Sequence, residues 1–166
     1  MRTKRPSTEP SKAASPPPHP DHPTLTSLRI SKALLDDVVE HAYADAPNEC
    51  CGLISSRDGE AVAVYRTVNT AKSKFKYVMD PQEQLRITDE IEDAGLDLGI
   101  IYHSHTRSDP VPSETDVNLA RFGDTDDPAW PGTLYLIVGT KNAEPDVRLW
   151  SIVGRSYEQV ELEVID

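Results

Sequence analysis

Two histidines and one aspartate lie close together in the stretch HSHTRSDPVPSETD, residues 103–116. A single serine separates His103 from His105, and Asp116 follows eleven residues after His105. On a β-strand, residues two positions apart point to the same face and lie roughly 6–7 Å from each other. Their imidazole nitrogens can then reach one metal ion, because histidine binds zinc at about 2.0–2.1 Å. The alternative is an ordinary strand end and polar turn that hold no ion.

Asp116 offers a third ligand if the turn after this strand folds back. Ser113 is predicted to cap a short helix whose third residue is Asp116. A capping box alone would account for this pair, but the same cap would also aim the carboxylate towards the histidines. Three protein ligands leave one position of a tetrahedral zinc open to water, which is typical of catalytic rather than structural sites.

Glu49 is the candidate base for such a site. It opens the stretch ECCGLI, residues 49–54, where an acid directly precedes a run that is expected to be buried. A carboxylate base beside a zinc-activated water is a peptide-hydrolysing pair. Ser113 could then donate a hydrogen bond to the oxyanion that forms on the attacked carbonyl. The alternative is that Glu49 is a surface acid without a catalytic role.

The elements that must position these residues follow from hydrophobic spacing. Apolar residues three and four apart after Ser31 predict a helix that ends before Pro47, and Asp80 with Pro81 begins a second helix that stops near Gly95. Alternation along residues 98–105 puts both histidines on one strand face and Tyr102 on the other. Short apolar runs predict five more strands, at residues 50–55, 60–68, 133–140, 147–154 and 157–165. The prediction is a mixed α/β domain with helices flanking one sheet.

Composition and charge limit the domain organisation and the classes of partner that this chain can have. Residues 1–24 are rich in Pro and Ser and are predicted to be a disordered tail, followed by one domain over residues 25–166. The formal net charge of −11 argues against nucleic acid as a partner, because phosphates would be repelled. No apolar run is long enough to span a membrane, so no membrane partner is expected.

The only cysteines, Cys50 and Cys51, are adjacent and cannot staple distant segments. They are interpreted as small buried hydrophobic residues rather than ligands or nucleophiles. With no apolar segment after the charged start MRTKR, secretion is not supported, and a cytoplasmic location is expected.

Glu49, the triplet His103-Ser104-His105, then Ser113 after seven residues and Asp116 after two more resemble the complete signature of the JAMM (MPN-plus) metalloproteases. The resemblance covers about residues 28–165. It implies the JAMM/MPN cytidine-deaminase-like fold, with one Zn²⁺ per chain held by the residues at 103, 105 and 116. It also implies that Glu49 is the general acid/base and that Ser113 steadies the tetrahedral intermediate. A non-catalytic MPN scaffold is the competing interpretation, but it predicts damaged ligand positions, and none is damaged.

Within this family the chain resembles the compact prokaryotic branch, because residues 123–132 are short and lack the Cys and His of larger insertions. The stretches NECCGLI, VMDPQEQL and IIYHSHTRSDPVPSETDVNLA are most similar to peptidases that trim sulfur-carrier proteins. The resemblance implies a ubiquitin-like carrier with a Gly-Gly tail as partner and release of its added cysteine in cysteine biosynthesis. Archaeal desampylases, which remove ubiquitin-like modifiers from lysine, share nearly the same motifs and stay an open alternative.

Lys72, Lys74 and Lys76 form an alternating basic strip in an acidic chain. If extended, they share one face and could bind an acidic partner near the site; otherwise they are a solvated edge. The carrier tail itself is expected to be held extended beside a sheet edge by main-chain pairing.

Overall fold

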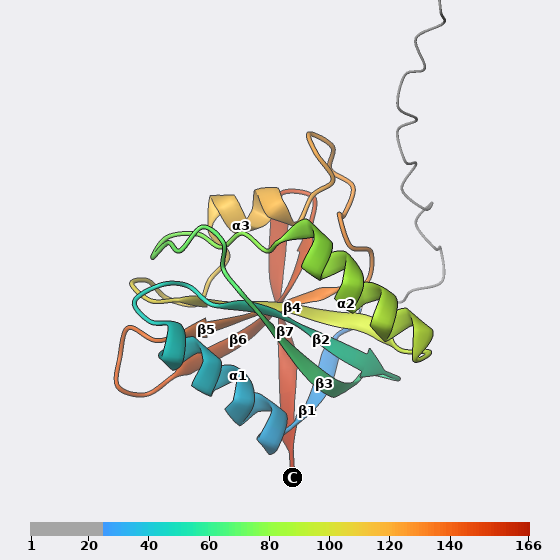
Figure 1. The fold of residues 1–166 in the computed structure, drawn as a ribbon, viewed down its shortest axis with the longest axis horizontal. Helices are drawn as coiled ribbons and strands as arrows, with labels where there is room; N and C mark the ends of the chain where they lie inside the picture. Colours follow the sequence, from blue (N-terminus) through green and yellow to red (C-terminus); the bar gives the residue numbers. More distant parts are fainter. Residues whose placement is uncertain (1–24) are drawn as a thin grey trace, which may run out of the picture.

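The computed structural model describes residues 25–166, in which seven strands and three helices form one mixed sheet with helices packed on it (Figure 1). The predicted tail, residues 1–24, lies outside the described residues. In chain order the elements are β1 (Ser27–Ser31), α1 (Lys32–Asp45), β2 (Cys51–Arg57), β3 (Glu60–Thr67), α2 (Pro81–Asp93), β4 (Asp97–His105), α3 (Glu114–Leu119), β5 (Leu134–Gly139), β6 (Asp146–Val153) and β7 (Ser156–Ile165).

The sheet curls until its two ends meet. Its strand order is β1-β3-β2-β4-β5-β6-β7, and β1 pairs with both β3 and β7, which closes the sheet. β4 pairs antiparallel with β2 and parallel with β5, so the strand that carries the histidines is central. β1 and β3 share a single residue pair, Arg29 with Glu60, so most of β3 has only β2 as a strand neighbour within residues 25–166. The expectation that substrate binds beside a sheet edge stays a prediction.

Strand β1 is the element that sequence patterning missed. Successive side chains of β1 alternate between exposed and buried, and Leu28 and Ile30 are fully buried. The strand is only five residues long and runs directly into the helix cap at Ser31, so its pattern merges with that of α1. Its main partner is β7, where Leu28 lies opposite Leu162, at the other end of the domain. No local signal marks such a pairing.

Helix boundaries follow the predicted caps. The Ser31 hydroxyl accepts a hydrogen bond from the Leu34 amide at 3.2 Å, and the Asp80 carboxylate accepts one from the Gln82 amide at 2.8 Å. Pro81 occupies the first turn of α2, where its missing N–H costs no helical hydrogen bond. Both predicted helices are thus confirmed, with their apolar faces turned to the sheet.

The two faces of β4 pack into two separate cores, as the alternation predicts. Ile100 and Tyr102 lie in the core beneath α1, whereas Ile101 lies with residues of α2 and α3 in the core on the opposite face. The histidines share this second face. Leu85 of α2 and Leu119 of α3 lie at the three- and four-residue spacing of apolar helix positions, yet they are 60% and 46% exposed. Ile87 and Val117 on the same two helices are buried, so only part of each apolar stripe is covered.

Helix α1 is tied to β4 by a buried polar contact. The Tyr102 hydroxyl lies 2.7 Å from His41 Nδ1, and His41 Nε2 lies 3.3 Å from the Asp45 carboxylate. The tyrosine ring fits because residue 52 is glycine, where an added Cβ would approach the ring to 2.3 Å. This contact anchors the end of α1, from which the chain runs on to Glu49.

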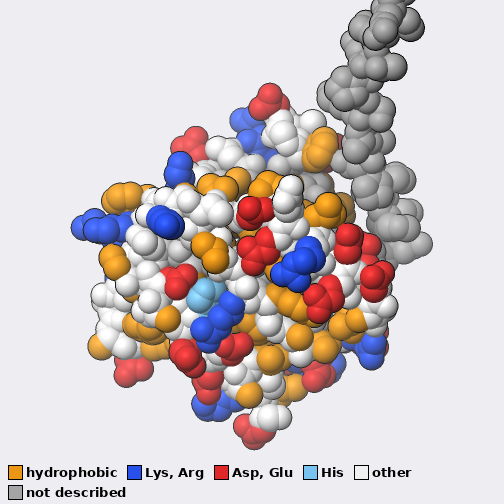
Figure 2. Space-filling model, viewed as in Figure 1, with side chains coloured by type: hydrophobic (Ala, Val, Ile, Leu, Met, Phe, Trp, Pro, Cys, Tyr) orange, Lys and Arg blue, Asp and Glu red, His pale blue; other side chains and the backbone are white. Residues whose placement is uncertain are grey.

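Acidic and basic side chains are interspersed over the face shown in Figure 2, so the net negative charge is not gathered in one area of that face. None of the helices within residues 25–166 has the length and apolar character that crossing a membrane requires.

Candidate metal centre and active site

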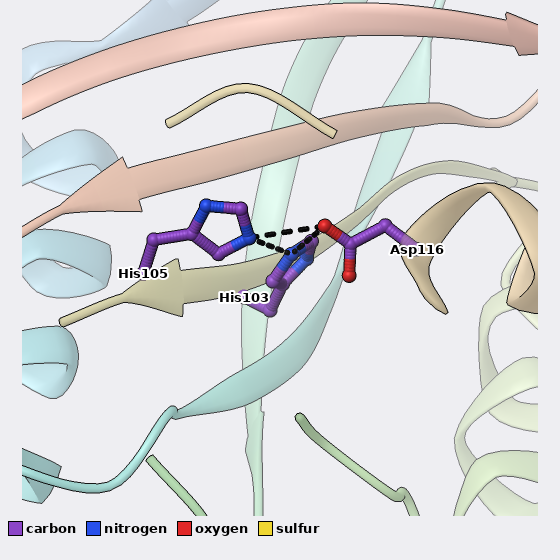
Figure 3. A group of neighbouring side chains, drawn as sticks. All are labelled: His103, His105 and Asp116. Carbon is purple, nitrogen blue, oxygen red and sulfur yellow. Dashed lines mark hydrogen bonds and ion pairs between the residues drawn. The ribbon is translucent and has the colours of Figure 1, made fainter. Parts of the chain in front are cut away.

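The end of β4 and the start of α3 bring His103, His105 and Asp116 together (Figure 3). Asp116 Oδ2 lies 3.1 Å from His103 Nε2 and 3.0 Å from His105 Nε2. The two Nε2 atoms are 3.2 Å apart. All three side chains are at most 5% exposed. The structure therefore gathers the three predicted ligands into one buried triangle of donor atoms.

The turn after β4 folds Asp116 back through the capping box at the start of α3. The Ser113 hydroxyl accepts a hydrogen bond from the Asp116 amide at 3.1 Å. In return, the Ser113 amide donates to Asp116 Oδ2 at 2.9 Å. The cap and the metal-directed role are compatible, because the same Oδ2 atom also faces both histidines.

Each histidine is held in place by its surroundings. His105 Nδ1 lies 2.8 Å from the Asp109 carbonyl oxygen, which fixes the tautomer with a free Nε2 lone pair. The ring of Tyr77 stacks on that of His103, with centroids 4.6 Å apart. Tyr77 comes from the connection between β3 and α2, so residues distant in sequence fix the ligand rings.

The donor triangle fits a zinc ion. Ligands at about 2.0–2.1 Å in a tetrahedron lie about 3.3 Å from one another, and the three donor atoms are separated by 3.0–3.2 Å. Two imidazoles and one carboxylate are also a donor set that zinc prefers in catalytic sites. The arrangement leaves a fourth position for water or substrate.

The ionisation of the ligands supports cation binding. Burial by itself would raise the pKa of Asp116, but His103 and His105 hold it well below its usual range. Burial disfavours the charged form of His105, yet hydrogen bonds to Asp116 and the Asp109 carbonyl raise the pKa of His105. Asp116 is thus an anion at neutral pH, which suits it to hold a cation between the two rings.

Glu49 lies just before β2 and is 3% exposed. Within the described residues its Oε2 atom has no hydrogen-bond partner. Burial raises the pKa of Glu49 to about 8, and the charges of His105 and Asp116 act on it as well. A buried carboxyl with one free oxygen and a near-neutral pKa is suited to exchange protons with a substrate.

The backbone of Glu49 is held on both sides. Its amide donates to the Ser73 carbonyl at 2.8 Å, and its carbonyl accepts from Asn69 Nδ2 at 3.0 Å. The amide of Cys50 donates to the Ser104 hydroxyl at 2.8 Å, which links the segment of Glu49 to the serine between the two histidines. Sequence reasoning did not single out Asn69. The only local signal was a polar residue directly after a strand.

The remaining candidates fall outside the donor triangle. Lys72, Lys74 and Lys76 are exposed, but their segment is not a strand, and Lys72 has a φ of 45°. The extended conformation that would place the three lysines on one face is therefore not present, because a turn interrupts the alternation, and their contact with a partner stays a prediction. Cys50 and Cys51 are fully buried free thiols, as interpreted from the sequence. Burial raises the pKa of Cys50 to about 12 and that of Cys51 to about 11, so neither is a ready thiolate.

Comparisons with known proteins agree with this site. The family described as prokaryotic homologs of the JAB domain matches residues 31–153. The chain is 37% identical to the desampylase of Haloferax volcanii over 134 residues, 75% of this chain and 87% of that protein. It is 30% identical to the CysO-cysteine peptidase of Mycobacterium tuberculosis over 146 residues, 86% of this chain and 94% of that protein. A solution structure from Desulfitobacterium hafniense matches with a TM-score of 0.72 at 26% identity, covering 84% of this chain and 93% of that one.

The chain therefore belongs to the prokaryotic JAB family, and its mixed α+β fold is the JAB/MPN fold. It is a JAMM-type metallopeptidase that carries the His–His–Asp group of a metal site. The resemblance noted in the sequence is thereby confirmed at the level of family, fold and class of enzyme.

Proposed function

We propose that this protein is a zinc-dependent peptidase that hydrolyses the bond after the C-terminal glycine of a ubiquitin-like sulfur-carrier protein and releases cysteine. The observation that carries the proposal is the buried carboxyl of Glu49, whose Oε2 has no hydrogen-bond partner within residues 25–166, near the triangle of His103, His105 and Asp116. Similarity to a CysO-cysteine peptidase over 94% of that protein supports the substrate. The reaction would take place in the cytoplasm as part of cysteine biosynthesis, with one zinc per chain.

Each residue has a role in the hydrolysis. His103, His105 and Asp116 would hold the zinc ion, which would supply a Lewis acid for the scissile carbonyl and for the attacking water. Glu49 accepts a proton from the attacking water, whose oxygen bonds to the carbonyl carbon. The Ser113 hydroxyl, which accepts from the Asp116 amide, still has its own hydrogen to donate to the developing oxyanion. Glu49 then returns its proton to the amine as the C–N bond breaks, leaving a carboxylate on the carrier.

Two substrates test the proposal. The enzyme is incubated with a carrier–cysteine adduct and with a carrier–lysine conjugate, and the products are identified by mass. We expect the cysteine adduct to be cleaved after the terminal glycine. The Glu49→Gln variant should retain about one zinc per chain but lose about 10²–10⁴-fold in turnover, because only the proton carrier is removed. Undiminished turnover in this variant would remove Glu49 from the mechanism.

An isopeptidase is the second candidate function. The desampylase of Haloferax volcanii supports it with the higher identity of the two relatives described above, 37%. The site chemistry is the same for both reactions. In each, the bond between the carbonyl carbon of the terminal glycine and an amine nitrogen is broken, and the amine departs after it has been protonated. Preferential cleavage of the lysine conjugate would decide for this alternative.

The exposed Lys72, Lys74 and Lys76 are proposed to contact the carrier. All three lie on the connection that contacts Glu49 through the Ser73 carbonyl. Reversing their charge should weaken carrier binding, with a loss that shrinks as salt is raised. Unchanged affinity would leave them as a solvated edge.

A further inference from the structure

A groove of about 460 Å³ lies beside the metal centre, lined by Ala46, Pro47, Lys74, Thr106, Arg107 and Thr140. We propose that this groove binds the α-carboxylate of the amino acid that leaves, so that the enzyme prefers a C-terminal amino acid over a protein lysine. The inference rests on the proposed peptidase function and names a feature of its substrate that the His–His–Asp motif does not determine.

The groove is built from segments that continue directly from the site. Pro47 lies two residues before Glu49, and Thr106 follows His105. The Thr106 hydroxyl donates to the Pro47 carbonyl at 2.9 Å, and the Thr140 amide donates to the His105 carbonyl at 3.0 Å. Lys74 enters from the third side, one residue after the Ser73 carbonyl that accepts from the Glu49 amide. The groove is therefore formed by the chain segments that directly adjoin Glu49 and His105.

The two cationic side chains of the groove, Lys74 and Arg107, form no ion pair with a carboxylate of the described residues. Within residues 25–166, neither Lys74 nor Arg107 has an acidic oxygen within 4.0 Å, although the chain has 28 acidic residues against 17 basic ones. The guanidinium of Arg107 instead stacks over the Phe75 ring, 5.7 Å from its centroid, which holds it at the rim. The basic residues that do have such partners are Arg29, Lys32, Arg66, Arg86, Arg121, Lys141, Arg148 and Arg155. Two unpaired cations in an acidic protein make a local site for an anion.

A hydroxyl in the groove also lacks a partner. Thr140 Oγ1 is buried and has no hydrogen-bond partner among the described residues. A buried hydroxyl without a partner costs free energy, so a ligand oxygen that accepts from it is favoured. Two cations and a free hydroxyl donor are the groups that recognise a carboxylate.

The size of the groove restricts which carboxylate can enter. A folded carrier is far too large for about 460 Å³, and a glycine-rich tail carries no charge beside its scissile bond. The α-carboxylate of a terminal amino acid lies one residue beyond that bond. In an isopeptide the leaving amine is the side chain of a lysine. The main-chain carbonyl of that lysine is farther from the scissile bond and carries no charge, because it is part of a peptide bond.

The test compares a carrier–cysteine adduct with the same adduct ending in cysteinamide, which keeps every atom near the scissile bond but removes the charge. We expect wild-type kcat/KM to be at least about 10-fold higher for the free acid. Arg107→Gln should lower that value by about 10-fold, mainly through KM, and change cleavage of the amide less than about two-fold. Lys74→Gln should slow cleavage of both substrates, because Lys74 is also proposed to contact the carrier, but it should slow cleavage of the acid more. The matched control is Arg57→Gln, because Arg57 is also exposed and unpaired among the described residues but ends β2 away from the site.

The outcomes separate this inference from the proposed function. Equal cleavage of acid and amide by the wild type, or equal losses on both in the variants, would overturn the carboxylate site and leave the peptidase intact. Preference for a lysine conjugate would overturn the carboxylate site and decide for the isopeptidase alternative. A wild-type protein that cleaves none of the three substrates would overturn the proposed function and this inference with it.

Discussion

The side-chain amide of Asn69 donates a hydrogen bond to the main-chain carbonyl oxygen of Glu49 at 3.0 Å. The same Nδ2 group also donates to the Lys76 carbonyl, and Asn69 Oδ1 accepts from the amides of Ala71 and Val78. One buried side chain thus joins the candidate base to the connection that carries Tyr77, whose ring stacks on His103. The position of the base relative to the metal ligands depends on this connection.

Replacing Asn69 by leucine should therefore reduce turnover without emptying the metal site. All four hydrogen bonds are lost, so Glu49 and Tyr77 are no longer held in register. We expect kcat to fall about 10²-fold, since misplacement of a reacting group by about 1 Å costs that much, while zinc content stays at the wild-type value. The control is Thr70→Val, which removes the hydroxyl that donates to the Val78 carbonyl but has no contact with Glu49. Matching losses of kcat in both variants, measured well below their melting temperatures, would show only general loosening of the connection.

Ser113 has two roles that substitutions can separate. Ser113→Ala removes both the hydroxyl that caps α3 and the proposed donor to the oxyanion. We expect about 1 kcal/mol lower stability from the lost cap and about 10²–10³-fold lower kcat from the lost donor. Ser113→Thr keeps a hydroxyl at the same place and should restore both. If the alanine variant loses stability but keeps its kcat, Ser113 is a cap only.

Asp116 is best tested by a change that keeps its shape. Asp116→Asn retains an oxygen that can accept from the Ser113 amide but removes the charge that faces both histidines. We expect zinc affinity, measured by competition with a chelator, to fall at least about 10-fold, as for weakened metal sites in general. The helix content of α3 should be preserved. Unchanged affinity would mean that zinc is bound elsewhere.

The buried carboxyl of Glu49 predicts how the metal-free protein responds to pH. Burial raises the pKa of Glu49 from 4.5 to about 8 in the folded state. Between these values the folded protein binds more protons than the unfolded chain, so stability falls as pH rises through the window from 4.5 to 8. His105, whose pKa is also raised, contributes a fall of the same sign above pH 6.5.

Glu49→Gln isolates the first of these effects. The variant cannot ionise at this position, so its melting temperature should exceed that of the metal-free wild type by roughly 3 °C or more at pH 8. Well below pH 4.5, where Glu49 is protonated in both states, the difference should vanish. If the difference in melting temperature between the two proteins stayed constant across the whole pH range, burial would not raise the pKa of Glu49.

The sequence by itself determined the helices α1 and α2, the strand that carries the histidines, and the helix cap before Asp116. These features depend on local rules: period-two alternation, caps at Ser31, Asp80 and Ser113, and prolines that begin or end helices. The spacing of Glu49, His103, His105, Ser113 and Asp116 also sufficed to predict the family.

Tertiary structure decided what depends on contacts between distant segments. Strand β1 exists because β7 pairs with it from the far end of the domain, and the exposure of Leu85 and Leu119 depends on how much of each helix the sheet covers. The tether from Asn69 to Glu49 and the groove with Lys74 and Arg107 also join segments far apart in the chain. No spacing rule describes such contacts, because side chains from separate elements meet only once the sheet has closed.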